Sequence, residues 1–568
     1  MKIQIEDVDD EEMARAVVAA VSQHLGKPVE MVTGDGSTVA SAGEKDDWDD
    51  EGTVVTEREE ALREDIADIV AGRKEDKQEK LDELDKLFVR DRLDLIFDEI
   101  EVEDGTFASF SSDDELPADG VITGIGTIDG RRVAFTANDY TVKAGTLGQD
   151  GAEKILRIEE KAMRLGIPLL RLIDSAGARL NAEEREPGDT HADRYTGGKM
   201  FYNQCRLSGK VPQIGVLYGP DIAGSAYTPV FCDYLIMVEG MGSMAIASAR
   251  IVRAMIGEDV DMQELGGAPV HSEHSGSADV VVPDEETAAA KVKQVLNYLP
   301  QNFREDPPTV EPKQPALNPK GLDAVIPENP QKEYDVNEVI DRLVDRESFQ
   351  ELKPEYGKEI VTGIGRIAGK PVGVVANQPT VNGGAIFPDA ADKASGFVWT
   401  CDAYNIPLLY LCDTPGFMVG TRVEKEGVLR RGRKFIYATS NAQVPKINLI
   451  TRKAYGAGIY AMAGPSFGPD TVLALPSAEI SVMGPDAAVH ALFGRQLEDM
   501  EGEAREAFID SAKDEFDKYI DIRKQASQME IDELIPAGDA REQLVKRFRV
   551  LESKEREEID RHHGTVLF

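Results

Sequence analysis

Short apolar runs alternate with amphipathic stretches along most of the chain. The apolar runs, which predict buried strands, are 133–137, 167–173, 213–218, 372–376, 406–412 and 446–451. Between them, a stretch such as 153–165 has apolar residues at the three- and four-residue spacing of an amphipathic helix. Strands that alternate with helices in this way predict an α/β fold built in layers.

The sequence also repeats itself at an interval of about 240 residues. Three pairs of segments align in the same order: 122–142 with 361–381, 167–177 with 406–416, and 211–227 with 444–460. In the first pair, 11 of the 20 positions from Thr123 onward are identical. Three aligned pairs in one order indicate two related domains in tandem.

A proline-rich segment separates the two copies of the repeat. It holds seven prolines between positions 307 and 330, which is typical of an extended linker. The predicted organisation is an acidic N-terminal extension at 1–84, a first domain at 85–305, the linker at 306–330, a second domain at 331–540 and a C-terminal helical tail at 541–568.

The N-terminal extension itself has three parts by pattern. Residues 1–35 predict a small amphipathic unit, with Met13, Val17, Ala20 and Val21 at helical spacing. Residues 36–56 predict a polar linker, and residues 57–98 predict charged helices. These helices present either a solvated face or a face that docks a partner.

Composition excludes several classes of function. The chain has 568 residues, of which 104 are acidic and 64 are Lys or Arg, so its formal net charge is −40. This balance argues against nucleic acid and anionic lipid as partners, because both need a basic surface. No window of about 18 apolar residues predicts a membrane span. The N-terminus also lacks the order of a secretory signal, so we expect a cytoplasmic protein.

The acidic excess is spread along the chain, because the first 80 residues hold only 23 acidic and 10 basic residues. One interpretation is a salt-adapted protein from a halophile, whose self-repulsion is screened at high ionic strength. The other is an ordinary acidic enzyme with an acidic extension. The spread of the charge favours the first.

Small-residue turns follow the predicted strands in both domains. They are 174–179 and 219–225 in the first domain and 413–417 and 454–458 in the second. Small residues allow close approach of a ligand to the backbone, and the start of a following helix offers free N–H groups. Such turns can form an oxyanion hole. They can also be tight corners needed only for packing, in which Asp174 and Asp413 cap the next helix.

Other catalytic signatures are absent or weak. No phosphate-binding loop of the GxxxxGK[ST] type and no HExxH motif is present, so no ATPase or metal site is indicated. No CxxC pair occurs among the four cysteines, Cys205, Cys232, Cys401 and Cys412. For His271 and His274 we predict a surface or core role, because no neighbouring ligand completes a metal site. The GxSxG string at 464–468 predicts a turn that ends a helix, because no strand precedes it and Pro469 follows.

Taken together, several segments resemble the carboxyltransferase (β) subunits of biotin-dependent acyl-CoA carboxylases, over about residues 85–540. The segments that carry the resemblance are 135–148, 172–180, 200–204, 257–276, 401–420, 444–464 and 480–489. The resemblance implies two tandem crotonase-like (ClpP/crotonase) domains in a homo-hexamer. It also implies that the first domain of one subunit faces the second domain of another.

The reaction implied by this resemblance moves a carboxyl group from carboxybiotin to the α (or vinylogous γ) carbon of an acyl-CoA thioester. Backbone N–H groups of Ala176 and Gly177 would then stabilise the thioester oxygen, and those of Ala457 and Gly458 the biotin oxygen. The neighbouring residues expected to contact substrate are Ser175, Ala178, Gly224, Ser225, Gly416, Phe417, Tyr455, Gly456 and Tyr460.

The sequence departs from the family's commonest motifs at two of these positions. Ala176 stands where a glycine is frequent, and Tyr460 stands where propionyl- and acetyl-CoA enzymes have an acidic residue. Propionyl-, acetyl- and methylcrotonoyl-CoA therefore remain alternative substrates. Coenzyme A is a polyanion, and Arg179, Arg452 and Lys453 are the basic residues nearest the turns in sequence.

The resemblance also implies partners. The chain has neither the lysine motif on which biotin is attached nor an ATP-handling domain, so it would act with a separate biotin carboxylase and biotin carrier subunit, without a metal of its own. The alternatives are the same subunit in a biotin-dependent decarboxylase or transcarboxylase, a crotonase-like hydratase or isomerase without biotin, and a non-catalytic scaffold.

Overall fold

The structure, a computed structural model, divides into two units, Met1–Asp68 and Ile69–Phe568. It describes residues 2–5, 18, 21, 29–33, 38–42, 55–110, 116–179 and 197–557. The first unit contains a three-stranded sheet, in which β2 (Val29–Thr33) pairs parallel with β1 (Lys2–Ile5) and antiparallel with β3 (Thr38–Ala42).

This small sheet corrects one prediction for the N-terminal extension. Strand β3 lies inside the segment 36–56, which we predicted to be a polar linker, because it pairs with β2 in spite of its polar flanks. Val21 is helical as predicted, whereas Met13, Val17 and Ala20 lie outside the described residues.

Helices follow where the charged segment 57–98 predicts them. They are α2 (Glu57–Ala71), α3 (Lys74–Glu83) and α4 (Val89–Ile96). In α4, Val89, Leu93 and Ile96 are buried at four- and three-residue spacing, so one face of the helix packs into the protein core.

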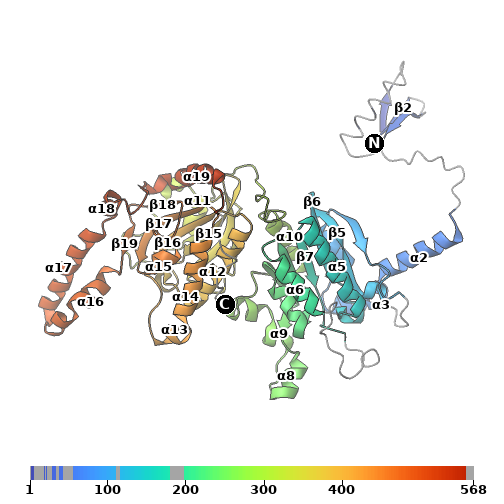
Figure 1. Ribbon diagram of the computed structural model, residues 1–568, viewed down its shortest axis with the longest axis horizontal. Coiled ribbons are helices and arrows are strands. Elements are labelled where there is room, and N and C mark those ends of the chain that lie inside the picture. The colour runs from blue at the N-terminus through green and yellow to red at the C-terminus, as the bar shows by residue number, and fades with distance from the viewer. Residues whose placement is uncertain are drawn as a thin grey trace. The chain divides into compact units, whose positions relative to one another are not determined.

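The first domain is built on a seven-stranded sheet with the order β12-β10-β8-β7-β6-β5-β4 (Figure 1). Its strands are β4 (Glu99–Asp104), β5 (Val121–Ile128), β6 (Arg131–Asn138), β7 (Leu169–Ile173), β8 (Gln213–Leu217), β10 (Tyr234–Val238) and β12 (Val280–Val282). Strands β4, β5 and β6 are antiparallel, and all strands from β6 to β12 run parallel.

Alternate residues of these strands face opposite layers of helices. Ala134 packs with the helices on one face, and the next residue, Phe135, packs with those on the other. The helices are α5 (Gln149–Leu165) and α6 (Gly197–Leu207) on the first face and α4 and α10 (Glu285–Leu296) on the second. Short elements complete the domain: β9 (Pro220–Ile222), α7 (Tyr227–Val230), β11 (Ser243–Ala245), α8 (Ala249–Ile256) and α9 (Met262–Gly266).

The second domain repeats this sheet in the order β13-β14-β15-β16-β17-β18-β20, with β19 paired to β17. Its strands are β13 (Gln350–Leu352), β14 (Ile360–Ile367), β15 (Lys370–Asn377), β16 (Leu408–Thr414), β17 (Lys446–Tyr455), β18 (Thr471–Ala474), β19 (Glu479–Ser481) and β20 (Glu533–Leu534). Val121 pairs with Asn138 in the first domain, and Ile360 pairs with Asn377 in the second. The two hairpins thus share one register, which confirms the repeat.

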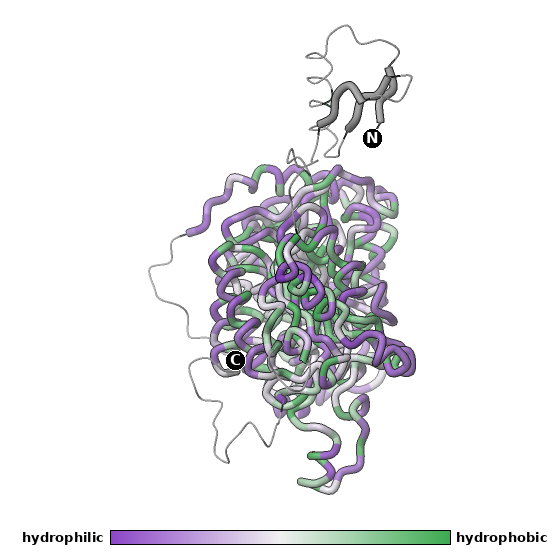
Figure 2. Tube along the Cα trace, turned by 90° about the vertical axis from the view of Figure 1, so that its right-hand side faces the viewer, coloured by the Kyte–Doolittle hydropathy of each residue, from purple (hydrophilic) through white to green (hydrophobic). Residues whose placement is uncertain are grey.

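Helices again cover both faces of the second sheet. Leu408 and Tyr410 face α12 (Pro388–Ala403) and α14 (Val428–Asn441), while Leu409 and Leu411 face α11 (Asn337–Leu343) and α19 (Ala540–Val550). The remaining helices are α13 (Thr421–Lys425), α15 (Gly458–Ala461), α16 (Pro485–Glu498), α17 (Gly502–Ile520) and α18 (Ile522–Ser527). Figure 2 shows apolar residues concentrated inside the unit Ile69–Phe568, which holds both domains, and hydrophilic residues on its outside.

The two domains contact each other directly. The Tyr404 hydroxyl of the second domain donates to the Asp233 carboxylate of the first at 2.6 Å. The proline-rich segment has little regular structure, but Leu322 and Ile326 are buried in the core of the second domain. Within the described ranges, no helix is both long and apolar enough to cross a bilayer.

Two motifs agree with their predictions, and the C-terminal segment begins with a helix. Helix α19 begins the predicted tail, of which 558–568 lie outside the described residues. The string 464–468 is a turn beyond the end of α15, as predicted. His271 has a structural role, because its ring nitrogens lie 2.8 Å from Ser275 Oγ and 2.9 Å from the Met244 carbonyl oxygen.

Candidate active site

The small-residue turns lie in pairs at the carboxyl ends of neighbouring parallel strands. In the first domain the turn after β7 contacts the turn after β8, and a Cβ on Gly177 would lie 2.9 Å from the Ile222 carbonyl oxygen. In the second domain the turn after β16 contacts the turn after β17, and a Cβ on Gly458 would lie 2.8 Å from Gly416 Cα. Glycine is therefore required at these contacts, as the sequence predicts.

Hydrogen bonds make the two pairs of turns equivalent. The Gly177 N–H donates to Ser175 Oγ at 3.1 Å, and the Gly416 N–H donates to Thr414 Oγ1 at 3.1 Å. Both glycines have positive φ, 95° and 116°. Ala178 and Phe417 occupy equivalent places too, in isolated bridges to Leu147 and Ile386 respectively.

The first pair of predicted amide donors is already engaged in this structure. The Ala176 N–H donates to the Ala144 carbonyl oxygen at 3.1 Å, and the Gly177 N–H bonds to Ser175. The equivalent of Ala176 in the second domain is Pro415, which has no N–H. Ala176 therefore connects the turn to the neighbouring loop. We predicted its amide as a donor to substrate, but in this structure the amide is engaged by Ala144.

Unengaged amides lie nearby at positions related by the repeat. Across the residues that the structure describes, no acceptor receives the N–H groups of Gly224 and Ser225 in the first domain or of Ala457 and Gly458 in the second. These donors stand at the start of short helical turns, where backbone N–H groups lack a partner within the helix. Gly456, by contrast, donates to the Ser481 carbonyl oxygen at 3.0 Å.

One further donor in each domain was missed by the sequence reasoning. Ala144 (φ 55°) and its equivalent Gly383 (φ 64°) have left-handed backbone in the loop beside the first turn, and in the described chain neither N–H has an acceptor. The signal was available in the repeat, because KAG at 143–145 aligns with NGG at 382–384.

Buried ion pairs anchor both turns. The Asp174 carboxylate lies 2.5 Å from Lys86 Nζ and 2.9 Å from Arg92, and Asp413 Oδ2 lies 2.9 Å from Arg452 Nε. The two aspartates therefore hold buried cations and do not cap a helix, because their oxygens face these partners. Burial lowers the pKa of Lys86 even though Asp174 acts in the opposite direction.

Ion pairs also engage the three basic residues considered for coenzyme A. Arg452 and Lys453 lie beside Asp413, and Arg179 is paired with Asp119. All three cations, the nearest to the turns in sequence, already have a carboxylate partner.

The aromatic residues of the second turn are partly accessible. Tyr460 is 44% exposed, and its ring stacks on Phe467 with 4.7 Å between the centroids. Tyr455 is buried, and its hydroxyl donates to Glu479. Tyr460 is thus the one of the two that is accessible to a ligand.

The turn after β8 contains a carboxyl group that titrates near neutrality. Asp221 is fully buried, and burial raises its pKa to about 7, although hydrogen bonds to Ser225 and the Ile222 N–H act in the opposite direction. Because the folded protein keeps this proton and the unfolded chain releases it near pH 4, stability falls as pH rises between those values.

We expect Asp221→Asn to remove this dependence, because asparagine does not titrate. At pH 8 the free energy of unfolding of the variant should exceed that of the unchanged protein by roughly 1–3 kcal/mol. At pH 5 the difference should be much smaller. Urea unfolding at both pH values measures the difference. An equal shift at both pH values would contradict the titration of Asp221.

No group of three or more His, Cys, Asp or Glu side chains in the described part of the chain is arranged to hold a metal ion. The two pairs of turns offer a set of backbone donors, with buried ion pairs anchoring them. Such a set can stabilise a developing negative charge on a substrate oxygen.

Comparison with known proteins fits this arrangement. Residues 82–566 match the family model of the carboxyl transferase domain. An uncharacterized carboxylase of Bacillus subtilis, YngE, is 49% identical over 480 residues, covering 84% of this chain and 93% of the relative. The propionyl-CoA carboxylase carboxyltransferase subunit of Haloferax mediterranei is 38% identical over 525 residues, covering 90% and 99%.

Among solved structures, the hexameric transcarboxylase 12S with methylmalonyl-coenzyme A and methylmalonic acid bound is similar, with a TM-score of 0.82 and 34% identity. The match covers 90% of this chain and 98% of that one.

Proposed function

The chain belongs to the carboxyl transferase family, as a carboxyltransferase subunit of the biotin-dependent acyl-CoA carboxylases, and we propose how its turns act in that reaction. The paired turns of the first domain bind the thioester of a short acyl-CoA, and those of the second domain bind the ureido group of biotin. Biotin, held on a separate carrier chain, supplies the carboxyl group. The observation that carries this proposal is the pair of equivalent amide sets, one in each repeat.

In the first domain, the thioester oxygen gains negative charge when the α carbon loses its proton, which the biotin nitrogen would accept once its carboxyl group has left. The unengaged N–H groups of Ala144, Gly224 and Ser225 support stabilisation of that oxygen. Ser175 and Gly177 then shape the turn, and Ala176 ties it to the loop of Ala144.

In the second domain, Ala457 and Gly458 offer two adjacent N–H groups to the ureido oxygen. That oxygen would gain charge as the carboxyl group leaves, and preorganised amide donors aimed at it would stabilise that charge. Gly416 and Phe417 form the facing wall, since Gly458 packs on Gly416.

We further propose a homo-hexamer that works in the cytoplasm with a biotin carboxylase and a biotin carrier subunit. Exposed apolar residues support subunit contacts: Met255 and Ile256 of α8 are 77% and 72% exposed, and Val482 and Leu492 of the second domain are 78% and 70% exposed. Helix α8 has no buried residue of its own, so its apolar face is uncovered in a single chain.

A half-reaction tests the proposed function without the partner chains. Purified protein is mixed with free biotin and malonyl-CoA or methylmalonyl-CoA, and loss of the carboxyl group is followed. Decarboxylation that depends on biotin supports the proposal. Complete inactivity of folded hexamer at low and molar salt would overturn it, and activity on an enoyl-CoA without biotin would favour a hydratase or isomerase.

The same subunit in a biotin-dependent transcarboxylase or decarboxylase is the second candidate, because the similar hexamer is a transcarboxylase. The partners separate the two. Purification from the source with an ATP-dependent biotin carboxylase supports the carboxylase, and purification with a membrane decarboxylase or a second carboxyltransferase supports the alternative.

The net charge of −40 leads to a prediction about salt. We expect activity and hexamer content to rise together from about 0.1 M to molar KCl, because the Debye length falls from about 10 Å to about 3 Å. Initial rates and analytical ultracentrifugation over the same salt series measure both. Full activity of intact hexamer at the lowest salt would contradict salt adaptation.

A further inference from the structure

The turn after β8 holds a buried carboxyl group to which the reaction described above gives no role. Asp221 is 1% exposed and lies in β9, where it pairs with Met244 of β11. Its Oδ1 atom is buried and has no hydrogen-bond partner among the described residues. A buried carboxylate with an unpaired oxygen costs free energy, so this geometry favours the neutral acid.

The hydrogen bonds of Ser225 also favour a proton on Asp221. The Ser225 hydroxyl donates to the Ile222 carbonyl oxygen at 2.8 Å. A hydroxyl has one proton, so the hydrogen bond between Ser225 and the Asp221 carboxyl group then uses the proton of the carboxyl group. If Asp221 loses that proton, the Ser225 hydroxyl has to turn toward the carboxylate and leave Ile222.

The bond from Ser225 to Ile222 closes the turn that carries two of the unengaged amides. Inside this turn, Ala223 has a φ of 66°, a left-handed conformation that is costly for alanine. The next two residues, Gly224 and Ser225, present N–H groups that no acceptor in the described chain receives. The protonation state of Asp221 thus reaches the thioester donors through one side chain.

The second domain has no carboxyl group at the equivalent place. With the offset of 233 residues, Ala223 aligns with Gly456, whose φ of 56° is also positive. Asp221 aligns with Ala454, which cannot titrate. The buried carboxyl group is therefore specific to the turns that we propose to bind the thioester.

Other titratable groups lie on the elements around this turn and have partners of their own. They are Asp174 with Lys86 and Arg92 beside the turn after β7, Tyr218 at the end of β8, Tyr227 of α7, and His271, which contacts the Met244 carbonyl oxygen of β11. None of these described groups sets the pKa of Asp221, which burial raises to about 7 against the hydrogen bonds from Ser225 and the Ile222 N–H. The carboxyl group therefore titrates near neutrality by itself.

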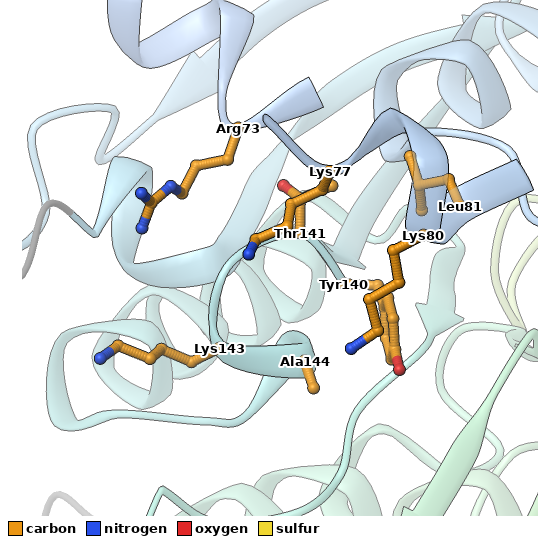
Figure 3. A pocket seen from close by; sticks show the side chains of 8 residues that line it. All are labelled: Arg73, Lys77, Lys80, Leu81, Tyr140, Thr141, Lys143 and Ala144. Atoms are coloured by element: carbon orange, nitrogen blue, oxygen red, sulfur yellow. The ribbon is translucent and has the colours of Figure 1, made fainter. Parts of the chain in front are cut away.

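The third unengaged donor of the first domain has surroundings of the opposite charge. Ala144 lines a cavity that is also lined by Lys77 and Lys80 (Figure 3). Cations near this donor favour negative charge on a thioester oxygen, whereas an ionised Asp221 beside the other two donors would oppose it. The oxygen is therefore stabilised best while Asp221 is neutral.

We propose that neutral Asp221 is a positioning residue for carboxyl transfer, because its proton on Ser225 keeps the turn closed and the amides of Gly224 and Ser225 directed at the thioester. The proposal rests on the proposed function for the identity of the reaction. Asp221 gives no proton to the substrate. Its ionisation opens the turn and adds a negative charge next to the developing one, so that transfer becomes slower.

The test is the ratio of the transfer rate of Asp221→Asn to that of the unchanged protein, from pH 6 to pH 8. Asparagine keeps a donor for Ser225 and cannot ionise. The rates are single-turnover transfer from the carboxylated carrier at saturating acyl-CoA, expressed per folded hexamer from sedimentation. We expect a ratio within about twofold of unity at pH 6 and about tenfold at pH 8, because only about a tenth of Asp221 stays protonated one pH unit above a pKa of about 7.

Asp233→Asn is the matched control, since it makes the same change in the same domain. Burial raises the pKa of Asp233 to about 7 as well, but its carboxylate accepts from the Tyr404 hydroxyl at 2.6 Å, at the amino ends of the parallel strands. Its rate ratio should not change with pH. A constant ratio for Asp221→Asn, or an equal rise for Asp233→Asn, would overturn the proposal.

Failure of the proposed function gives a different result, because hydrogen exchange reports on the turn without substrate. If the unchanged protein transfers no carboxyl group, amide exchange of residues 222–232 is compared at pH 6 and pH 8 after correction for intrinsic rates. Loss of protection at pH 8 in the unchanged protein, but not in Asp221→Asn, supports the positioning role. Equal protection of the two proteins at both pH values overturns it.

Discussion

Ala457→Pro is expected to lower kcat for carboxyl transfer about 100- to 1,000-fold while the protein stays folded. Proline removes the N–H that we propose to stabilise the biotin ureido oxygen. The substitution suits the backbone, because Ala457 has φ −71°, near the value that proline requires, and its N–H has no acceptor in the described chain. The lost activity would then report on the missing donor.

Ala457→Gly is the control for this variant, since it keeps the N–H and removes only the methyl group. Single-turnover transfer from the carboxylated carrier measures the chemical step, and sedimentation measures the hexamer. We expect the glycine variant to remain within a fewfold of the unchanged protein. Near-normal transfer by the proline variant would mean that this amide takes no part in the reaction.

Other positions in the turns are less suitable for such a test. Proline at Gly177 would require a negative φ where the structure has 95°, so it would disturb the fold. Alanine at Gly458 would place a Cβ 2.8 Å from Gly416 Cα. Loss of activity in either variant could result from misfolding as well as from a missing donor.

The pairing of the turns could be predicted because it depends on sequence order and strand direction. Buried apolar strands followed by small residues define positions that a parallel sheet brings to one edge. The repeat predicted the fold of the second domain, since the hairpin from Thr123 and its copy from Thr362 share eleven identical residues.

The state of each backbone N–H could not be predicted, because it depends on contacts between segments distant in sequence. Ala176 donates to Ala144 across 32 positions, and only the folded loop reveals this bond. Asp174 was assigned as a possible cap from its place before a turn. Its partners Lys86 and Arg92 come from the helical segment before the first sheet.

The second large effect concerns stability, and we expect it from Asp413→Asn. This carboxylate lies 2.9 Å from Arg452 Nε and 3.5 Å from Lys453 Nζ, and the three side chains are almost fully buried. Neutralising it leaves two buried cations without a countercharge. Loss of one partner from such a buried cluster costs about 3–5 kcal/mol of unfolding free energy.

Trp399 provides the measurement, because it lies in α12 of the second domain and the only other tryptophan is Trp48. In a Trp48→Phe background, denaturant unfolding followed by fluorescence reports on the domain that contains Asp413. Glu542→Gln is the control, since it breaks an exposed pair with Lys546 within one helix and should cost less than about 0.5 kcal/mol. If Asp413→Asn cost no more than this control, the buried cluster would contribute nothing measurable, and the position of Gly416 would have to depend on packing against Gly458 alone.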